Sequence, residues 1–175
     1  MRSVLVATCA LAFAVPAARA QMPESYRDVQ LSALRLQRTM LVSMVDSMPE
    51  RLYTDRTTPE QRDFAHQLHH AAGAIGFIGT RVMGAAAAGI PDTNATTFTT
   101  RAGLKQYINA LYDWAETTHR AQTPAQRAES VSLFGTEMPR WKIWDEIHMH
   151  TVWTAGQVVA NFRKHGMAPP GFGFF

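Results

Sequence analysis

Apolar residues recur every three or four positions through four long segments of this chain, and that spacing limits the folds it can adopt. An α-helix turns once in 3.6 residues, so apolar side chains at such intervals gather on one face. The four sets are Val29, Leu36, Met40 and Met44; Phe64, Leu68, Ala71, Ile75, Ile78 and Val82; Leu104, Ile108, Leu111 and Trp114; and Trp144, Ala155, Val158 and Phe162. No stretch of useful length alternates apolar and polar residues as a half-buried strand does. We therefore expect an all-α protein, a four-helix bundle around one core.

Proline and acidic residues indicate where these helices begin and end. Pro49 stops the first helix, and Thr58-Pro59-Glu60 would place a proline and an acid in the first turn of the second. The expected helices span 26–48, about 59–87, about 100–121 and 139–165. A polar loop at 91–99 precedes the third helix, and a longer connection at 123–135 precedes the fourth.

The start of the chain has the form of a secretory signal peptide. A basic Arg2 precedes an apolar run, and the small residues Ala18 and Ala20 form an A-x-A cleavage site. The run is too short for a transmembrane span, which needs about 20 apolar residues. We expect residues 1–20 to be removed. The mature protein, residues 21–175, would then be secreted or periplasmic, without a stable membrane anchor.

Removal of this leader changes the charge and the chemistry of the chain. Cleavage would remove Arg2, Arg19 and Cys9, so that the mature chain contains 15 Lys and Arg residues and 14 Asp and Glu residues. A nearly neutral protein has no electrostatic reason to bind nucleic acid, although the whole chain has a pI near 9.4. The mature chain lacks cysteine, which excludes disulfides, thiol nucleophiles and a c-type haem. The 155 residues that remain suit a single domain.

The end of the chain carries a distinctive order of residues. It reads DEIHMHTVWTAGQVVANFRKHGMAPP over 145–170, with Gly156-Gln157 inside the expected helix and Pro169-Pro170 after it. Four shorter motifs precede it, MPE at 48–50, TPEQR at 58–62, HAA at 70–72 and SLFG at 132–135. In order and spacing, these motifs resemble those of the DinB/YfiT family of four-helix bundles over residues 26–172.

The resemblance implies a divalent metal site built from three histidines, one on the second helix and two on the fourth. Transferred to this chain, the ligand positions are His70, His150 and Thr154, so a threonine stands where the third histidine belongs. Three imidazoles leave an open position at which a metal activates water or a thiol, whereas a neutral hydroxyl is a poor ligand. The implied site for Zn or Ni is therefore incomplete, and weak catalysis or none is expected from it.

Two further histidines are alternatives for the missing ligand. His66 lies one turn before His70, and a pair at this spacing can chelate a metal from one helix face, although periodicity places both on a polar flank. His148 falls near the middle of the apolar stripe of the fourth helix. It is expected to be either a core histidine bonded to a neighbour or a displaced ligand. His119 and His165 lie near helix ends, where a cation suits the helix dipole.

The sequence leaves three functions open. The first is an exported bundle with a degenerate metal site, and the second is a metal-dependent hydrolase or thiol transferase that uses His70 and His150. The third is a metal-free module that holds a small molecule in the apolar core, among Trp141, Trp144 and Trp153. No motif identifies the substrate or decides whether the protein is an enzyme. An exposed apolar helix face would also permit a homodimer.

Overall fold

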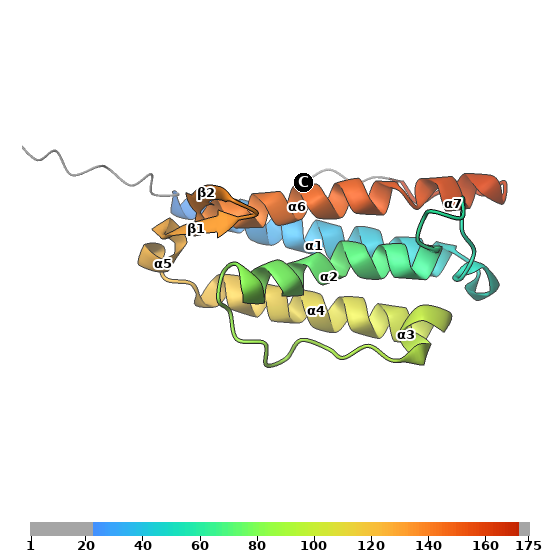
Figure 1. The fold of residues 1–175 in the computed structure, drawn as a ribbon, viewed down its shortest axis with the longest axis horizontal. Helices are drawn as coiled ribbons and strands as arrows, with labels where there is room; N and C mark the ends of the chain where they lie inside the picture. The colour runs from blue at the N-terminus through green and yellow to red at the C-terminus, as the bar shows by residue number, and fades with distance from the viewer. Residues whose placement is uncertain (1–22, 172–175) are drawn as a thin grey trace, which may run out of the picture.

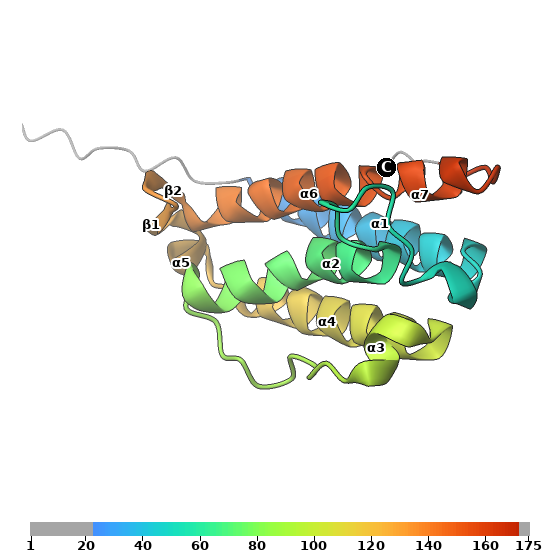
Figure 2. The same ribbon diagram turned by 45° about the vertical axis from the view of Figure 1, so that its right-hand side comes forward.

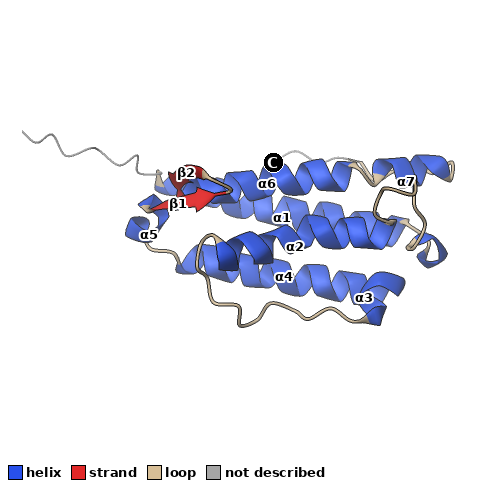
Figure 3. Ribbon diagram, viewed as in Figure 1, coloured by secondary structure: helices blue, strands red, loops and turns tan. Residues whose placement is uncertain are grey.

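The computed structural model describes residues 23–171, so the expected signal peptide lies outside the described residues. Helices make up most of this part (Figure 3). They are α1 (Glu24–Ser47), α2 (Phe64–Arg81), α3 (Ala95–Thr99), α4 (Arg101–Ala121), α5 (Pro124–Ala128), α6 (Arg140–Gly156) and α7 (Val159–Lys164), with a 3-10 turn at Glu50–Leu52. Strands β1 (Ser130–Leu133) and β2 (Thr136–Pro139) form an antiparallel hairpin. The expectation of a helical protein is therefore confirmed, with one small hairpin added.

The four long helices, α1, α2, α4 and α6, lie side by side along the long axis of the molecule (Figures 1 and 2). Both α4 and α6 pack against α1 and α2. Helices α2 and α4 run in the same direction, because the segment 82–94 returns along the length of the molecule before α3 begins (Figure 1). The hairpin and α5 lie at one end, and α3 and α7 lie at the other.

Side chains from all four long helices fill one core. Fully buried members include Leu34, Leu41, Leu68, Ile75, Leu104, Ile108, Ile143 and Ile147. Each such side chain contributes roughly 1.5–3 kcal/mol by leaving water. Gly79 lets α2 approach α4 closely, since a Cβ added there would lie 2.5 Å from Cη2 of Trp114. The apolar stripes of α2, α4 and α6–α7 thus meet in the interior, as their spacing predicts. The stripe of the first helix lies partly outside it, with Val29 43% exposed, and the buried face there carries Leu34, Leu41 and Met48 instead.

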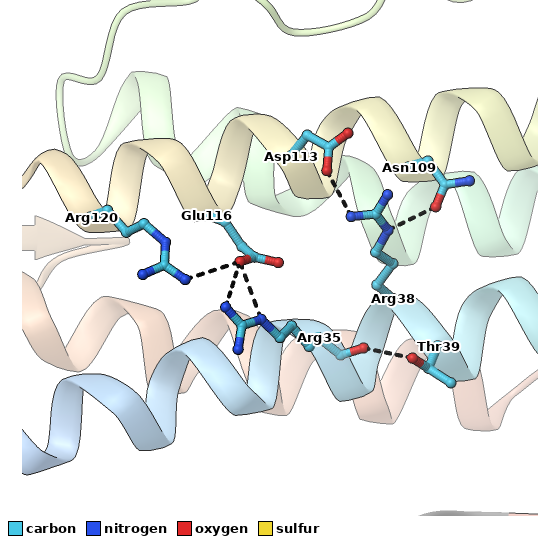
Figure 4. A network of polar contacts seen from close by, with 7 residues as sticks. All are labelled: Arg35, Arg38, Thr39, Asn109, Asp113, Glu116 and Arg120. Atoms are coloured by element: carbon cyan, nitrogen blue, oxygen red, sulfur yellow. Dashed lines mark hydrogen bonds and ion pairs between the residues drawn. The ribbon is translucent and has the colours of Figure 1, made fainter.

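Ion pairs join the outer faces of α1 and α4 (Figure 4). Arg38 donates from Nη1 to Asp113 Oδ1 at 2.7 Å and from Nε to Asn109 Oδ1 at 2.7 Å. Arg35 Nη2 lies 3.2 Å from Glu116 Oε2. Exposed pairs of this kind contribute about 0.2–1 kcal/mol each. The packing of these two helices therefore depends on the core more than on this network.

Helix α2 is shorter at both ends than the expected span of 59–87, although its apolar stripe, Phe64 to Val82, matches the observed helix. The side chain of Asp63 accepts a hydrogen bond at 2.9 Å from a backbone N–H in the first turn, so the helix begins at Phe64. The TPE motif forms a turn ahead of that cap. At the other end Gly84 adopts a φ of 66°, and the helix stops at Arg81 instead of continuing to about residue 87. Capping groups mark both ends, and the start signal at Thr58-Pro59-Glu60 lies ahead of the actual cap.

The expected fourth helix is interrupted between α6 and α7, around Gln157 and Val158. The backbone N–H of Val158 donates to the carbonyl of Ala155 at 3.1 Å, which is an interaction three residues back. The carbonyl of Thr154, which Val158 would use in a continuous helix, accepts from Gln67 Nε2 at 3.2 Å and from the backbone N–H of Gln157 at 3.3 Å. A side chain of α2 and the next backbone N–H thus share this acceptor, and the backbone forms a 3-10-like turn.

Two segments expected to be loops contain short elements. Asn94 caps α3 inside the polar loop, accepting hydrogen bonds from the backbone N–H groups of Thr96 and Thr97. The hairpin of β1 and β2 turns at Phe134 and Gly135, whose φ angles are 50° and 90°. Two consecutive positive φ angles match the twist of a two-residue hairpin turn. This turn brings an aromatic side chain to the site described next.

Candidate functional site

His70 of α2 and His150 of α6 face each other where these two helices pack. Their ring centroids lie 5.2 Å apart, and the ring planes meet at 78°. Both side chains are half-buried. The hydroxyl of Thr154, one turn further along α6, lies 3.4 Å from His150 Nε2. His150 therefore contacts both of the other positions that the family resemblance indicates.

The spacing of the two histidines suits a shared metal ion, but the set of donor atoms around them is incomplete. Two imidazoles on one tetrahedral ion have ring centroids roughly 5 Å apart, given metal–nitrogen distances of about 2.0–2.1 Å. The His70–His150 pair has this spacing. Within residues 23–171, however, no group of three or more His, Cys, Asp or Glu side chains could hold a metal ion. Thr154 offers only a neutral hydroxyl, so the residues present do not complete the three-histidine site.

His148 lies on a different side of α6 and contacts α1. Its Nδ1 lies 2.8 Å from Gln37 Nε2, and Gln37 Oε1 accepts a hydrogen bond from the hydroxyl of Tyr112 at 3.2 Å. Gln37 is buried, as is Tyr112. This geometry matches a core histidine bonded to a neighbour, and it gives no support to a displaced metal ligand.

His66, the other alternative ligand, is engaged with its own helix cap. Its Nδ1 lies 2.7 Å from Asp63 Oδ1, and its ring stacks on Phe98 of α3 with centroids 4.1 Å apart. Asp63 is buried, so one carboxylate both caps α2 and orients this imidazole. His66 and His70 line a common cavity, described below, without forming a metal-binding group there.

His69 is a residue of this site that sequence reasoning missed. Its ring stacks on Tyr107 of α4 at 4.5 Å and contacts Phe98 at 5.0 Å. Burial lowers its pKa to about 4, and its Nε2 is buried without a hydrogen-bond partner in the part of the chain that the structure describes. The helical wheel puts His69 on a polar flank, which α3 and α4 cover. Three histidines within five residues were the only signal in the sequence.

The histidines between α2 and α6 are neutral at neutral pH. Burial is the main cause that lowers the pKa of His70 and of His150, and the positive charge of Arg62 lowers both further. Among residues 23–171, the buried Nδ1 of His150 has no hydrogen-bond partner. A neutral imidazole carries one donor and one acceptor. His70 of α2 and His150 of α6 can therefore each form a hydrogen bond with a polar atom of a ligand.

Two cavities meet at these histidines. The larger, of about 480 Å³, combines His69, His70 and His150 with an apolar wall of Ala74, Phe77, Ile78, Tyr107 and Phe134. The smaller, of about 250 Å³, is lined by Arg56, Arg62, Asp63 and His66 together with His69 and His70. Ligand pockets for small organic molecules typically measure about 300–1,000 Å³. The shared histidines thus separate an apolar compartment of that size from a charged one.

Two exposed aromatic side chains lie at the apolar compartment. Phe77 is 55% exposed and Phe134 is 83% exposed, although both contribute to the cavity wall. Phe134 also has a φ of 50°, a conformation that costs a non-glycine residue about 1–2 kcal/mol. A strained and exposed aromatic residue beside a cavity is a feature of ligand sites, where a bound molecule would cover it.

The three tryptophans named from the sequence lie elsewhere. Trp144 is buried and donates to Gln122 Oε1 at 3.0 Å, and the ring of Trp141 lies against Tyr26 with centroids 6.0 Å apart. Trp153 is 76% exposed on α6. The cavity beside the histidines is therefore lined by phenylalanine and tyrosine, and not by the tryptophans expected from the sequence.

His119 is not the helix-end cation that its position in the sequence suggests. Its side chain is completely buried, its ring lies 5.0 Å from Trp144, and its Nε2 lies 3.0 Å from Gln30 Oε1. Burial lowers its pKa to about 4, so it is neutral. His165 does meet an acid, with Nε2 2.7 Å from Asp55 Oδ2.

Comparison with known proteins does not identify the chain. No family model matches it, and neither the curated proteins nor the solved structures give a match. In residues 23–171, none of the helices has the length and apolarity needed to cross a membrane.

Proposed function

We propose that the mature protein is an exported, DinB-like four-helix bundle that binds a small organic molecule beside His70 and His150. The observation that carries this proposal is the apolar cavity of about 480 Å³, into which neutral histidines and two exposed phenylalanines face. Its size suits a small organic ligand. The histidines supply polar contacts that would orient the ligand, and the phenylalanines supply apolar area that would be buried on binding.

Binding is favoured over catalysis because the reactive groups are few. The hydroxyl of Thr154 and His150 Nε2 are 3.4 Å apart, which is a long contact for the activation of a nucleophile. The only carboxylate of the two cavities, Asp63, is committed to the helix cap and to His66. The protein would then keep the position of the family's metal site without its chemistry.

A neutral fluorescent probe tests this proposal. N-phenyl-1-naphthylamine should bind the mature protein with enhanced emission, and the binding should persist in EDTA. Ala74→Phe places a ring in the cavity and should abolish the binding without changing the circular dichroism spectrum. Ala102→Phe, at an exposed position of α4, is the matched control and should bind as the original chain does. Binding that survives Ala74→Phe contradicts the assignment of the ligand to this cavity.

The 5.2 Å spacing of the histidine pair favours a second candidate. In this alternative a divalent ion, Zn or Ni, binds to His70 and His150 with exogenous ligands, and supports a hydrolase or a thiol transferase. Metal analysis of the untagged protein decides between the two. Stoichiometric metal that His70→Ala removes would support the enzyme, and no metal after reconstitution would exclude it.

Export is part of the same proposal and is tested by a separate measurement, the position of the mature amino terminus. Cleavage after Ala20 predicts that the mature chain begins at Gln21. Amino-terminal sequencing of the protein recovered from the secreted or periplasmic fraction should therefore start at that residue. Recovery of the intact amino terminus from the cytoplasm would contradict export.

A further inference from the structure

The two cavities adjoin at His69 and His70, which line both of them, and they differ in charge. Together they are called the cleft, and a ligand that spans it would pass these two rings. The apolar end carries Phe77 and Phe134, and the opposite end carries Arg56 and Arg62. A ligand that satisfies both ends must itself have two chemically different ends.

The arginine end holds two exposed arginines, Arg56 and Arg62, and one buried carboxylate, Asp63. Within residues 23–171 neither arginine forms an ion pair, because Asp63 contacts His66 and Asp55 contacts Lys164. Arg56 donates from Nη1 only to the carbonyl of Pro59, at 3.3 Å. Asp63 already accepts from His66, and Glu60, which lines an adjoining polar pocket with Arg62, is not paired with it. The guanidinium groups are therefore available to an anion.

The chemistry of the arginines indicates the kind of anion. A guanidinium group presents planar, paired donors that match the two oxygens of a carboxylate or of a related oxyanion. Two such groups at one end of a cleft favour a negatively charged headgroup over a neutral or a cationic one. The neutral histidines next to them add donors without adding charge.

The apolar end indicates the rest of the ligand. Phe134 and Phe77 leave large apolar areas in contact with water, and covering such area stabilises a complex by about 25 cal/mol per Å². The cavity behind them, of about 480 Å³, has room for a medium-length hydrocarbon chain or an aromatic ring system. A small hydrophilic anion would leave this end unfilled.

We infer that the cleft binds an anionic amphiphile, with its carboxylate at Arg56 and Arg62 and its apolar tail against Phe77 and Phe134. This inference rests on the proposed function, since it names the class of small molecule that the same site would take. It also assigns the two arginines, which carry no function in the family resemblance, to ligand recognition.

Calorimetric titration with decanoate, decanol, acetate and decyltrimethylammonium tests the inference on the mature protein. Decanoate should bind at least about tenfold more tightly than decanol, and acetate should bind much more weakly than either, because each end of the ligand contributes. Arg56→Gln with Arg62→Gln should reduce the affinity for decanoate about tenfold and leave that for decanol unchanged. Arg81→Gln, at an exposed arginine of α2 outside both cavities, is the matched control.

The outcomes separate this inference from the proposed function. Equal binding of decanoate and decanol, unaffected by the arginine substitutions, would overturn the anionic ligand and leave a binding cavity in place. Tighter binding of decyltrimethylammonium would also overturn it. No binding of any of the three long-chain probes would contradict both proposals. A loss of decanoate affinity in the Arg81→Gln control would show a nonspecific charge effect and overturn the role of the two arginines.

Discussion

The molecule holds two sets of inward-facing histidines, and the difference between them separates structure from function. His119 and His148 lie among buried glutamines of α1, and each has a hydrogen-bond partner there, Gln30 and Gln37 respectively. His70 and His150, with His69 beside them, border a cavity. His119 is enclosed by the chain and His148 is half-buried against α1, whereas the second set adjoins space that a ligand could fill. Burial alone does not distinguish them, but the presence of adjoining space does.

This comparison predicts that substitutions in the two sets reduce the stability of the fold by different amounts. A hydrogen-bonded core network loses stability when one member is removed, because its partners remain buried and unsatisfied. Substitution of a residue at a ligand site should reduce the stability of the fold only slightly, since such a site is selected for binding.

Gln37→Ala should destabilise the fold by about 4 kcal/mol. It leaves Tyr112 and His148 without their contacts to the amide and opens a void at a fully buried position. Urea denaturation measures the change. His70→Ala is the comparison variant and should cost about 1 kcal/mol or less. Equal losses in the two variants would remove the distinction between the two sets.

Acidification should destabilise the protein through His119. Its pKa is about 4 in the folded chain and near 6.5 when unfolded, so between these values the unfolded state binds more protons. Stability is therefore fully present above about pH 6.5 and is lost as the pH falls towards 4, by at most on the order of 3 kcal/mol. The positive charges of Arg27, Arg127 and Arg120 add to the effect of burial.

Denaturation between pH 7 and pH 4, with His119→Gln as the variant, checks this dependence. The variant should be less stable at pH 7 and should show a shallower loss on acidification. His69, whose pKa is also lowered to about 4, remains in the variant, so some slope should persist. An unchanged slope would show that His119 does not carry the dependence.

Thr154→His should create metal binding at the cleft. It adds a third imidazole one turn from His150 and beside the pair whose spacing suits a shared ion. Zn at one hundred times its dissociation constant would then stabilise the variant by about 2.7 kcal/mol. Thermal denaturation with and without Zn measures this, and combining the change with His70→Ala should abolish it. No stabilisation by Zn would mean that the three positions do not converge.

Apolar spacing predicted the long helices, because a helical stripe must be buried whatever the neighbouring elements do. The start signal at Thr58-Pro59-Glu60 and the expected end near residue 87 placed α2 too far out at both ends, where the side chain of Asp63 and the φ of Gly84 mark the actual limits. Apolar spacing itself failed at the break after α6, where the amide of Gln67 contacts the carbonyl of Thr154. These features depend on local geometry or on a contact between helices, and the apolar period reports neither.

The site was predictable only in part, for a related reason. The motif order of the resemblance indicated His70 and His150, and the structure places them in contact. It gave no indication of His69 or Phe134, because the walls there come from α3, α4 and the hairpin. These residues are distant in the sequence, and a pattern within one helix cannot show which flank they cover. The arginine end is lined by residues 56–70 alone, and the resemblance assigned no role to its arginines.

Phe134→Asn should have the smallest effect on stability, and of the opposite sign. Asparagine followed by Gly135 is the preferred pair for a hairpin turn with two positive φ angles, so the fold should gain about 1 kcal/mol. The same change removes an aromatic wall of the cleft and should weaken the binding of the neutral probe. Phe77→Asn, on the regular helix α2, should weaken binding without the gain. If Phe134→Asn stabilises the protein and leaves binding intact, the aromatic ring of Phe134 does not contribute to binding. The contrast between core and cleft would then not extend to the hairpin.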